Sequence, residues 1–521
     1  MQSYVYLLIK PAAILKHMDK ISEDKQNWKI LDCLIGISAV VLLLVAGVLI
    51  IKKIMVNPSA DWDYARLAWT FALTHGYRLY YGLDNGPILC TTYGPLGPLA
   101  FLPATLAKTP VPALFIGTSL SIAYYFLPVL WLHIKGSLSD LKRLLPSLFC
   151  FGFFCLFTVA SPALRYSGLR VHVDAPALGL CVIACAFLYF KKAGDGRRAL
   201  MWCALFSVLS VWTKQVAIFL LPALSVYILI RDGYNDFKRY LFYLLVFGIP
   251  ISILFLFMFG PKEIMLNLFI VQSRIGTLQG LPITLLELAP DWVLFAPILI
   301  IYTFYRYSAS DKKDGFKKLL SEDRWIMLLL VSFFMAPISI FGRMKAGGDY
   351  NAFSYTLYFL VAAFTLALKG ILLDEASPGL QLSRSYIKSL VILLVIILTC
   401  GEFSELYKIS TLPFKRSVDR CETAYKYLKN HPGEAYFPNY PLAHLLAEGK
   451  LYHFSVGLWD RATAGYPITE KHFKDYIPPD PKYMVEPGEF GSDVVKKYLR
   501  EFSQQVKVDG LAGCITYSRK K

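Results

Sequence analysis

Two acidic residues, Asp61 and Asp63, stand one residue apart in the stretch "DWDYARLAWTFALTHGYRLYYG". A carboxylate can accept the proton of an attacking hydroxyl group, and an Asp-x-Asp pair could also hold Mg²⁺ or Mn²⁺ through its oxygens. Both residues could equally form the acidic first turn of a surface helix, where negative charge is favourable. Three roles for the pair therefore remain open: a general base, a metal site and the start of a helix.

A second set of polar residues lies beside apolar segments further along the chain. It consists of cations and one carboxylate: Arg165, Arg170, Asp174, Lys214, Arg343 and Lys345. Arginine gives a phosphate group two parallel charge-assisted hydrogen bonds, so the set predicts a site for an anionic lipid phosphate. Each cation taken alone could instead reach toward lipid headgroups, and Asp174 could cap a helix.

Composition shows which elements must position these residues. The chain has 521 residues, of which 56% are hydrophobic and 17% are charged, and its mean hydropathy is +0.47. A bilayer core is crossed by about 20 apolar residues. We therefore predict an all-α polytopic membrane protein with about 11 spans, near residues 30–51, 111–134, 144–161, 174–190, 199–213, 216–230, 240–259, 291–305, 325–341, 351–368 and 387–401.

Lysine and arginine predict the orientation, because positive charge is retained on the cytoplasmic side. The segments "KGSLSDLKR", "KKAGDGRR", "RDGYNDFKR" and "RYSASDKKDGFKK" become cytoplasmic when the N-terminus is inside. Residues 1–29 then form a cytoplasmic segment, 30–401 the membrane domain, and 52–110 one large external loop. The net charge of +17 needs no nucleic-acid partner. All the polar residues above lie on the external side.

Residues 402–521 are more polar, and we expect a small external α/β domain there. One helix is predicted over "SDVVKKYLREFSQQ", with Val494, Val495, Tyr498, Leu499 and Phe502 on one face, followed by a strand in "LAGCITYS". The segment "CETAYKYLKNHPGEAYFP" predicts the same order of helix, turn and strand. Cys421 and Cys514 lie near the two ends of this domain, and we predict a disulfide between them, with Cys90 as the competing partner.

Several stretches together resemble the C-type (GT-C) glycosyltransferases, and within them the protein mannosyltransferase and aminoarabinose transferase relatives. The stretches are "DWDYARLAWTFALTHGYRLYYG", "YGPLGPL", "RYSGLRVHVDAPALGL" and "TKQ", with a weaker match at "GGDYNAF". The resemblance covers residues 30–230. It implies an inverting transfer of a sugar from a polyprenyl-phosphate donor to a hydroxyl acceptor on the extracytoplasmic face.

The resemblance also implies roles for individual residues. Asp61 or Asp63 would activate the acceptor, with Asp61 favoured by family position, and Arg165, Arg170 and Lys214 would bind the donor phosphate. One departure concerns Tyr93, because "YGPLGPL" stands where the aminoarabinose enzymes carry Lys-Pro-Pro-Leu. The phosphate must then be held by another cation. Metal use varies within the superfamily, and we expect no required metal, with Mg²⁺ or Mn²⁺ at Asp61 and Asp63 as the alternative.

Other functions remain open at this stage. A flippase for lipid-linked glycans or a small-solute transporter would also place cations in a membrane cavity, although we find no internal repeat of the transporter type. A polysaccharide polymerase would depend on arginine-rich external loops. The chain contains no GxxxxGK[ST] or GxGxxG stretch for a nucleotide. No acceptor sequon for N-glycosylation occurs either, and a bacterial inner membrane fits best.

Overall fold

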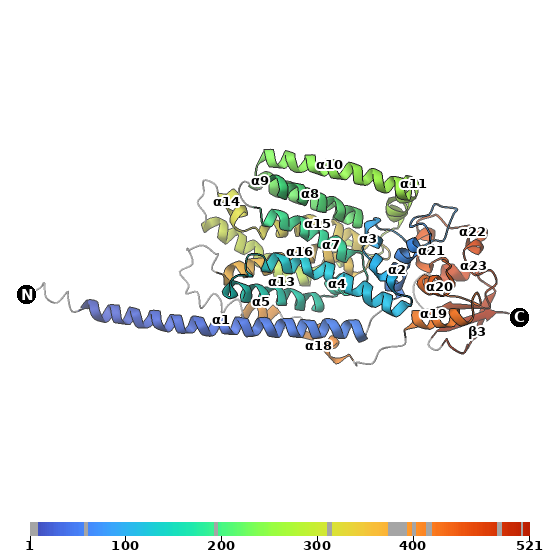
Figure 1. Cartoon of the computed structure of the whole chain (residues 1–521), viewed down its shortest axis with the longest axis horizontal. Coiled ribbons are helices and arrows are strands. Elements are labelled where there is room, and N and C mark those ends of the chain that lie inside the picture. The colour runs from blue at the N-terminus through green and yellow to red at the C-terminus, as the bar shows by residue number, and fades with distance from the viewer. Residues whose placement is uncertain are drawn as a thin grey trace, which may run out of the picture.

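The computed structural model describes residues 9–56, 61–191, 196–309, 315–373, 393–398, 403–412, 419–486, 492–511 and 514–520. Only the backbone is described for residues 9–31 and for some residues at element ends, among them Asp61. The chain forms a helical bundle with a smaller unit of helices and strands at one end (Figure 1).

Long apolar helices form the bundle. They are α1 (Ile9–Val56), α4 (Pro110–Ile134), α5 (Leu141–Ala160), α7 (Asp174–Tyr189), α8 (Gly196–Thr213), α9 (Leu220–Arg231), α10 (Tyr234–Phe259), α13 (Leu281–Ala309), α15 (Ile326–Met344) and α16 (Ser354–Leu372). A buried apolar cluster rich in Phe, Leu and Ala runs through α4, α5, α7 and α16. Burial of these faces against one another holds the bundle together.

Seven helices of the described residues are long and apolar enough to cross a membrane, and two more apolar helices are shorter. The chain is therefore an integral membrane protein, as predicted. Ten of the predicted spans fall on helices of the bundle. The predicted span 387–401 lies largely outside the described residues, where only 393–398 are seen as helix. A total of eleven spans stays a prediction.

The segments between the helices gather at two opposite ends of the bundle (Figure 1). The N-terminal end of α1 and helix α14 (Gly315–Glu322) lie at one end. The other end carries the short elements α2 (Asp61–Thr74), α3 (Leu96–Leu99), η1 (Leu102–Leu106), α6 (Pro162–Gly168), α11 (Pro261–Ile264), η3 (Met265–Ile270), α12 (Val271–Arg274), η2 (Gln215–Phe219) and η4 (Tyr350–Phe353). This grouping agrees with the predicted connectivity and places the candidate residues at one end. Which end is external stays a prediction.

The described residues from 419 onward form a mixed unit of helices and strands at that same end. That they are a separate external domain stays a prediction. The helices of this unit are α19 (Arg420–Asn430), α20 (Pro441–Glu448), α21 (Ser455–Thr463), α22 (Glu470–Asp475) and α23 (Ser492–Tyr498), whereas α18 (Phe403–Thr411) packs beside α1 and α5. Strands β1 (Ala435–Tyr436), β2 (Tyr483–Glu486), β3 (Phe502–Val506) and β4 (Ile515–Arg519) form one sheet in the order β1-β2-β4-β3. β1 and β2 are parallel, and the other neighbours are antiparallel, with Met484 opposite Tyr517.

Two expectations for this unit are wrong. The helix predicted over "SDVVKKYLREFSQQ" ends at Tyr498, and Phe502 begins strand β3, because pairing with β4 supplies the backbone hydrogen bonds. The predicted disulfide between Cys421 and Cys514 is not formed. Both cysteines instead pack in one apolar cluster that also contains residues of α2.

The C-terminal unit rests directly on the first loop. The backbone N–H of Phe454 donates to the carbonyl of Ile88 at 2.8 Å, and the N–H of Ile88 donates to His453 Nδ1 at 3.0 Å. The Trp62 ring at the start of α2 packs edge-on against Phe454, with 5.4 Å between ring centroids. The unit therefore covers α2, which carries the acidic pair.

Candidate active site

The first loop passes very close to the bundle at "YGPLGPL". A Cβ atom on Gly94 would lie 1.9 Å from the carbonyl oxygen of Trp212, so only glycine fits there. Gln215 of the "TKQ" stretch fixes the same segment, because its Nε2 donates to the carbonyl of Thr92 at 2.9 Å. These contacts hold Tyr93 over Lys214, whose Nζ lies 5.3 Å from the ring centroid.

Asp63 lies in the first turn of α2, and its side chain is fully buried. Arg66, one helical turn later, pairs with it, with 3.4 Å between Nη1 and Oδ1. The same guanidinium donates to the carbonyl of Val171 at 3.1 Å and to the Tyr166 hydroxyl at 3.2 Å. A helix start is thus confirmed at Asp61, but Asp63 faces the protein interior. The side chain of Asp61 lies outside the described part of the chain.

Asp174, the first residue of α7, is the centre of a second buried group. Its carboxylate pairs with Lys214 and accepts hydrogen bonds from Ser167 Oγ at 3.0 Å and Asn351 Nδ2 at 2.9 Å. His172 Nδ1 lies 2.8 Å from the same carboxylate. Four different segments of the chain therefore meet at one carboxylate. It satisfies buried donors, and the predicted cap is not formed, because Val173 is the N-cap of α7 and no side chain bonds there.

His172 joins the two buried groups. Its ring lies 5.6 Å from the Tyr166 ring and 5.9 Å from the Tyr93 ring, measured between centroids. Burial, together with the nearby Arg66 guanidinium, lowers the pKa of His172 to about 3, so the imidazole is neutral. We call the connected set Asp63, Arg66, Tyr166, His172, Asp174, Lys214 and Asn351 the polar network.

A group of cations lies where α1 ends beside α6. Lys53 is close enough to Arg165, Arg170 and Asp63 to interact with each electrostatically. The guanidinium of Arg165 is occupied by Glu405, at 3.2 Å, and by the carbonyls of Val159 and Ala160. The Arg170 guanidinium lies over the Tyr166 ring at 4.7 Å. Among the described residues, Arg170 and Lys53 have no carboxylate within ion-pair distance.

Arg343 and Lys345 have partners of their own. Arg343 pairs with Glu287 through two nitrogens, at 2.8 and 2.9 Å, and donates to the carbonyl of Gly348. Lys345 donates to the backbone carbonyl of Gln272. These contacts brace the turn that precedes η4, where the Asp349 side chain accepts from the N–H of Tyr350. The segment reaches the polar network through Asn351 instead.

No divalent-cation site is found among the described residues, which do not include the side chain of Asp61. They contain no group of three or more His, Cys, Asp and Glu side chains arranged to hold a metal ion. The Arg66 guanidinium lies 3.4 Å from Asp63 and would repel a second cation there.

Sequence reasoning overlooked four residues of this site: Lys53, Arg66, Tyr166 and Ser167. Lys53 ends the first span on the side away from the N-terminus, which runs against the usual charge bias and could have marked it. Arg66 stands three residues after Asp63, which is the spacing of an ion pair on one helical face. Ser167 carried no comparable signal, because a serine in a turn is common.

Comparisons with known proteins show which solved structures share this fold. No family model and no curated protein sequence matches the chain. Among solved structures, ArnT from Cupriavidus metallidurans bound to undecaprenyl phosphate matches with a TM-score of 0.55 and 12% identity, over 92% of this chain and 97% of ArnT. The apo state of ArnT matches with a TM-score of 0.56 and 13% identity, again over 92% of this chain and 97% of ArnT. The oligosaccharyltransferase AglB from Archaeoglobus fulgidus matches at 0.45 and 11%, over 86% of this chain and 69% of AglB.

The likeness to ArnT extends through the bundle and into the C-terminal unit, because it covers nearly the whole of both chains. At 12–13% identity it concerns the fold and not the individual side chains. The chain therefore has the fold of ArnT, which confirms the fold implied by its resemblance to the aminoarabinose transferases.

Proposed function

We propose that this protein is a membrane glycosyltransferase that moves a sugar from a polyprenyl-phosphate donor to a hydroxyl group. The observation that carries the proposal is the burial of Asp63 beside Lys53 and the neighbouring Arg170 at one end of an ArnT-like bundle. A solved ArnT structure contains undecaprenyl phosphate, the kind of lipid that such a donor would release. The cations suit its phosphate, and the carboxylate suits the acceptor.

In the proposed reaction, the acceptor hydroxyl attacks the anomeric carbon of the donor sugar. A bond forms between the acceptor oxygen and that carbon, while the bond from the carbon to the phosphate oxygen breaks. The polyprenyl phosphate leaves with the electron pair, and Asp63 takes the hydroxyl proton. Attack from the face opposite the leaving group inverts the anomeric centre, as the family resemblance implies.

The charges divide this work. Lys53 and Arg170 would hold the phosphate and stabilise the charge that grows on it as the bond breaks. Arg66 orients the Asp63 carboxylate through the ion pair on α2. Arg165 and Lys214 become positioning residues, because Glu405 and Asp174 already neutralise them. Of the cations that the family resemblance assigned to the donor phosphate, Arg170 therefore keeps that role, and Lys53 is added.

Asp63 replaces Asp61 as the preferred base. Its carboxylate is buried and is linked through Arg66 to Tyr166. We further propose that the site faces the extracytoplasmic side of a bacterial inner membrane, where nucleotide sugars are absent and lipid-linked donors replace them. The acceptor is then a lipid, a glycan or a protein that reaches this surface.

Transfer from a polyprenyl-phosphate sugar, measured with purified protein in lipid nanodiscs, tests the proposal. Asp63→Asn keeps the side-chain size but removes the proton acceptor, so turnover should fall at least about a hundredfold. Donor affinity should stay within a few-fold. Asp84→Asn is the matched control, because Asp84 is an exposed carboxylate of the same loop.

Near-normal transfer by both Asp63→Asn and Asp61→Asn would contradict the assignment of a base to this acidic pair. Loss of transfer in Asp61→Asn alone would move the role to Asp61. Movement of the lipid-linked sugar across the bilayer without a new glycosidic bond would instead indicate a flippase.

A further inference from the structure

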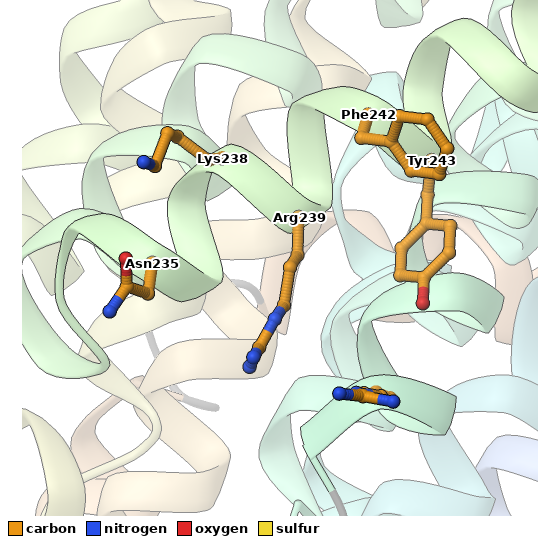
Figure 2. A pocket seen from close by; sticks show the side chains of 6 residues that line it. Asn235, Lys238, Arg239, Phe242 and Tyr243 are labelled. Atoms are coloured by element: carbon orange, nitrogen blue, oxygen red, sulfur yellow. The ribbon is translucent and has the colours of Figure 1, made fainter.

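A pocket of about 430 Å³ lies at the other end of the bundle, away from the polar network. The beginnings of α8 and α10 form it, and its lining is basic and aromatic: Arg197, Asn235, Lys238, Arg239, Phe242 and Tyr243. Figure 2 shows Arg239 and Tyr243 extending from α10 toward the same side. The proposed transfer reaction uses none of these residues.

Positive charge in this pocket exceeds the carboxylates that could neutralise it. Arg239 pairs with Asp236 at 2.9 Å, and Asp236 is shared with Lys191 at 2.7 Å. Lys238 lies over the Tyr234 ring at 4.7 Å. Within the described part of the chain, Arg197 and Lys238 have no carboxylate partner. An anion entering the pocket would therefore meet at least two cations that no acid satisfies.

The helix ends strengthen this imbalance. Arg197 is the second residue of α8, while Lys238 and Arg239 follow the first turn of α10, which contains Asp236. The N-terminal end of a helix carries partial positive charge, so cations are unfavourable there and anions are favourable. An anion beside Arg197 is therefore favoured by the start of α8, whereas the first turn of α10 already carries the carboxylate of Asp236.

The surface next to the pocket shows what kind of anion fits. Phe242, Leu245, Ile249 and Ile253 follow one another along one face of α10 and are between 55% and 62% exposed. Trp202 on α8 is 41% exposed. In a membrane protein such an apolar face contacts acyl chains, and the basic pocket begins where that face ends. A molecule with a phosphate group and attached acyl chains would fill both regions.

We propose that this pocket binds the phosphate of an anionic phospholipid from the leaflet opposite the active site. Arg197 and Lys238 would hold the phosphate, Asn235 and the Tyr243 hydroxyl would donate to its oxygens, and the acyl chains would lie along α10. A free phosphate offers the same charge but would leave the apolar face uncovered. The proposal does not depend on the transfer reaction.

Native mass spectrometry of the whole chain in detergent tests the proposal, with 1-palmitoyl-2-oleoyl-phosphatidylglycerol as the probe. The matching phosphatidylcholine is the comparison lipid. Wild-type protein should retain phosphatidylglycerol more strongly. Arg197→Gln should weaken that binding about fivefold, which corresponds to about 1 kcal/mol for one basic residue at a membrane surface.

Lys142→Gln is the matched control, because Lys142 is an exposed cation in the first turn of α5, which begins at the same end of the bundle. Its affinity for phosphatidylglycerol should stay within twofold of wild type. Lys238→Gln tests the same pocket where Arg197→Gln does not fold, as judged by its melting curve.

Three results would overturn the proposal. Equal binding of the two lipids by wild type would show that the basic residues of the pocket only orient the protein during membrane insertion. Equal losses in Lys142→Gln and the pocket variants would indicate a diffuse surface potential. Displacement of phosphatidylglycerol by millimolar inorganic phosphate would show that the pocket takes the free ion.

Discussion

The ion pair between Asp174 and Lys214 gives the sharpest energetic prediction. Asp174 is fully buried, and Lys214 is 9% exposed. Asp174→Asn keeps the shape of the side chain but leaves the ammonium group of Lys214 without its counter-charge. Lys214→Met keeps the length of the side chain and leaves the carboxylate with two neutral donors, Ser167 and Asn351.

The structure predicts the size of each effect. Removing one partner of a buried pair costs about 3 to 5 kcal/mol, because the remaining charge stays buried. We expect Asp174→Asn near the upper end of that range and Lys214→Met near the lower end, since hydrogen bonds still satisfy the carboxylate. The double variant removes both charges, so it should lose about 3 kcal/mol less than the sum of the single losses.

Reversible unfolding in mixed micelles of a mild detergent and dodecyl sulfate measures these free energies. Neutral hydrogen bonds between membrane helices couple by only about 0.6 kcal/mol on average. A coupling energy of that size between Asp174 and Lys214 would refute the buried ion pair. Lys214 would then be available to the donor phosphate, as the sequence suggested.

Three further predictions concern binding, pH and metal. Arg170→Gln should weaken binding of polyprenyl phosphate at least tenfold, and Arg165→Gln should have a smaller effect because Glu405 already neutralises it; equal losses in a fluorescence binding assay would contradict this. Burial raises the pKa of Asp460 from 3.8 to about 6, so the folded chain binds more protons and stability falls as pH rises through that window. The free energy of unfolding of Asp460→Asn should therefore exceed that of wild type by about 3 kcal/mol at pH 7.5 and equal it near pH 4. Transfer should survive EDTA, and restoration of a lost activity by Mn²⁺ would show a required metal.

Sequence patterns predicted the parts of the fold that depend on local physics. Apolar runs predicted the bundle helices, and charge asymmetry predicted that residues as distant as Asp63 and Lys345 share one end. The beginning of α2 at Asp61 could be inferred from its two acidic residues and from Pro58 shortly before them. Phe502 shows the limit: it fits the apolar face of a helix, yet cross-strand pairing with β4 decides its conformation.

The partners of the charged residues could not be predicted in the same way. Arg165 and Glu405 are 240 residues apart, and Arg343 and Glu287 are separated by 56. Nothing in the local sequence of either arginine indicates that a carboxylate will neutralise it. Gly94 is similar, because the carbonyl of Trp212 that requires a glycine lies on α8, far away in the sequence.

The cations that remain after pairing, rather than all the cations at a membrane surface, indicate where a phosphate binds. At the end that carries the candidate site, Asp174, Glu405 and Glu287 neutralise three of the predicted cations, and Lys345 is held by Gln272. Lys53 and Arg170, which lie near Asp63, have no ion pair with a carboxylate of the described residues. A phosphate at that place would contact cations that no described carboxylate already neutralises. The same criterion, applied at the other end of the bundle, selects Arg197 and Lys238 and leads to a second anion of different origin.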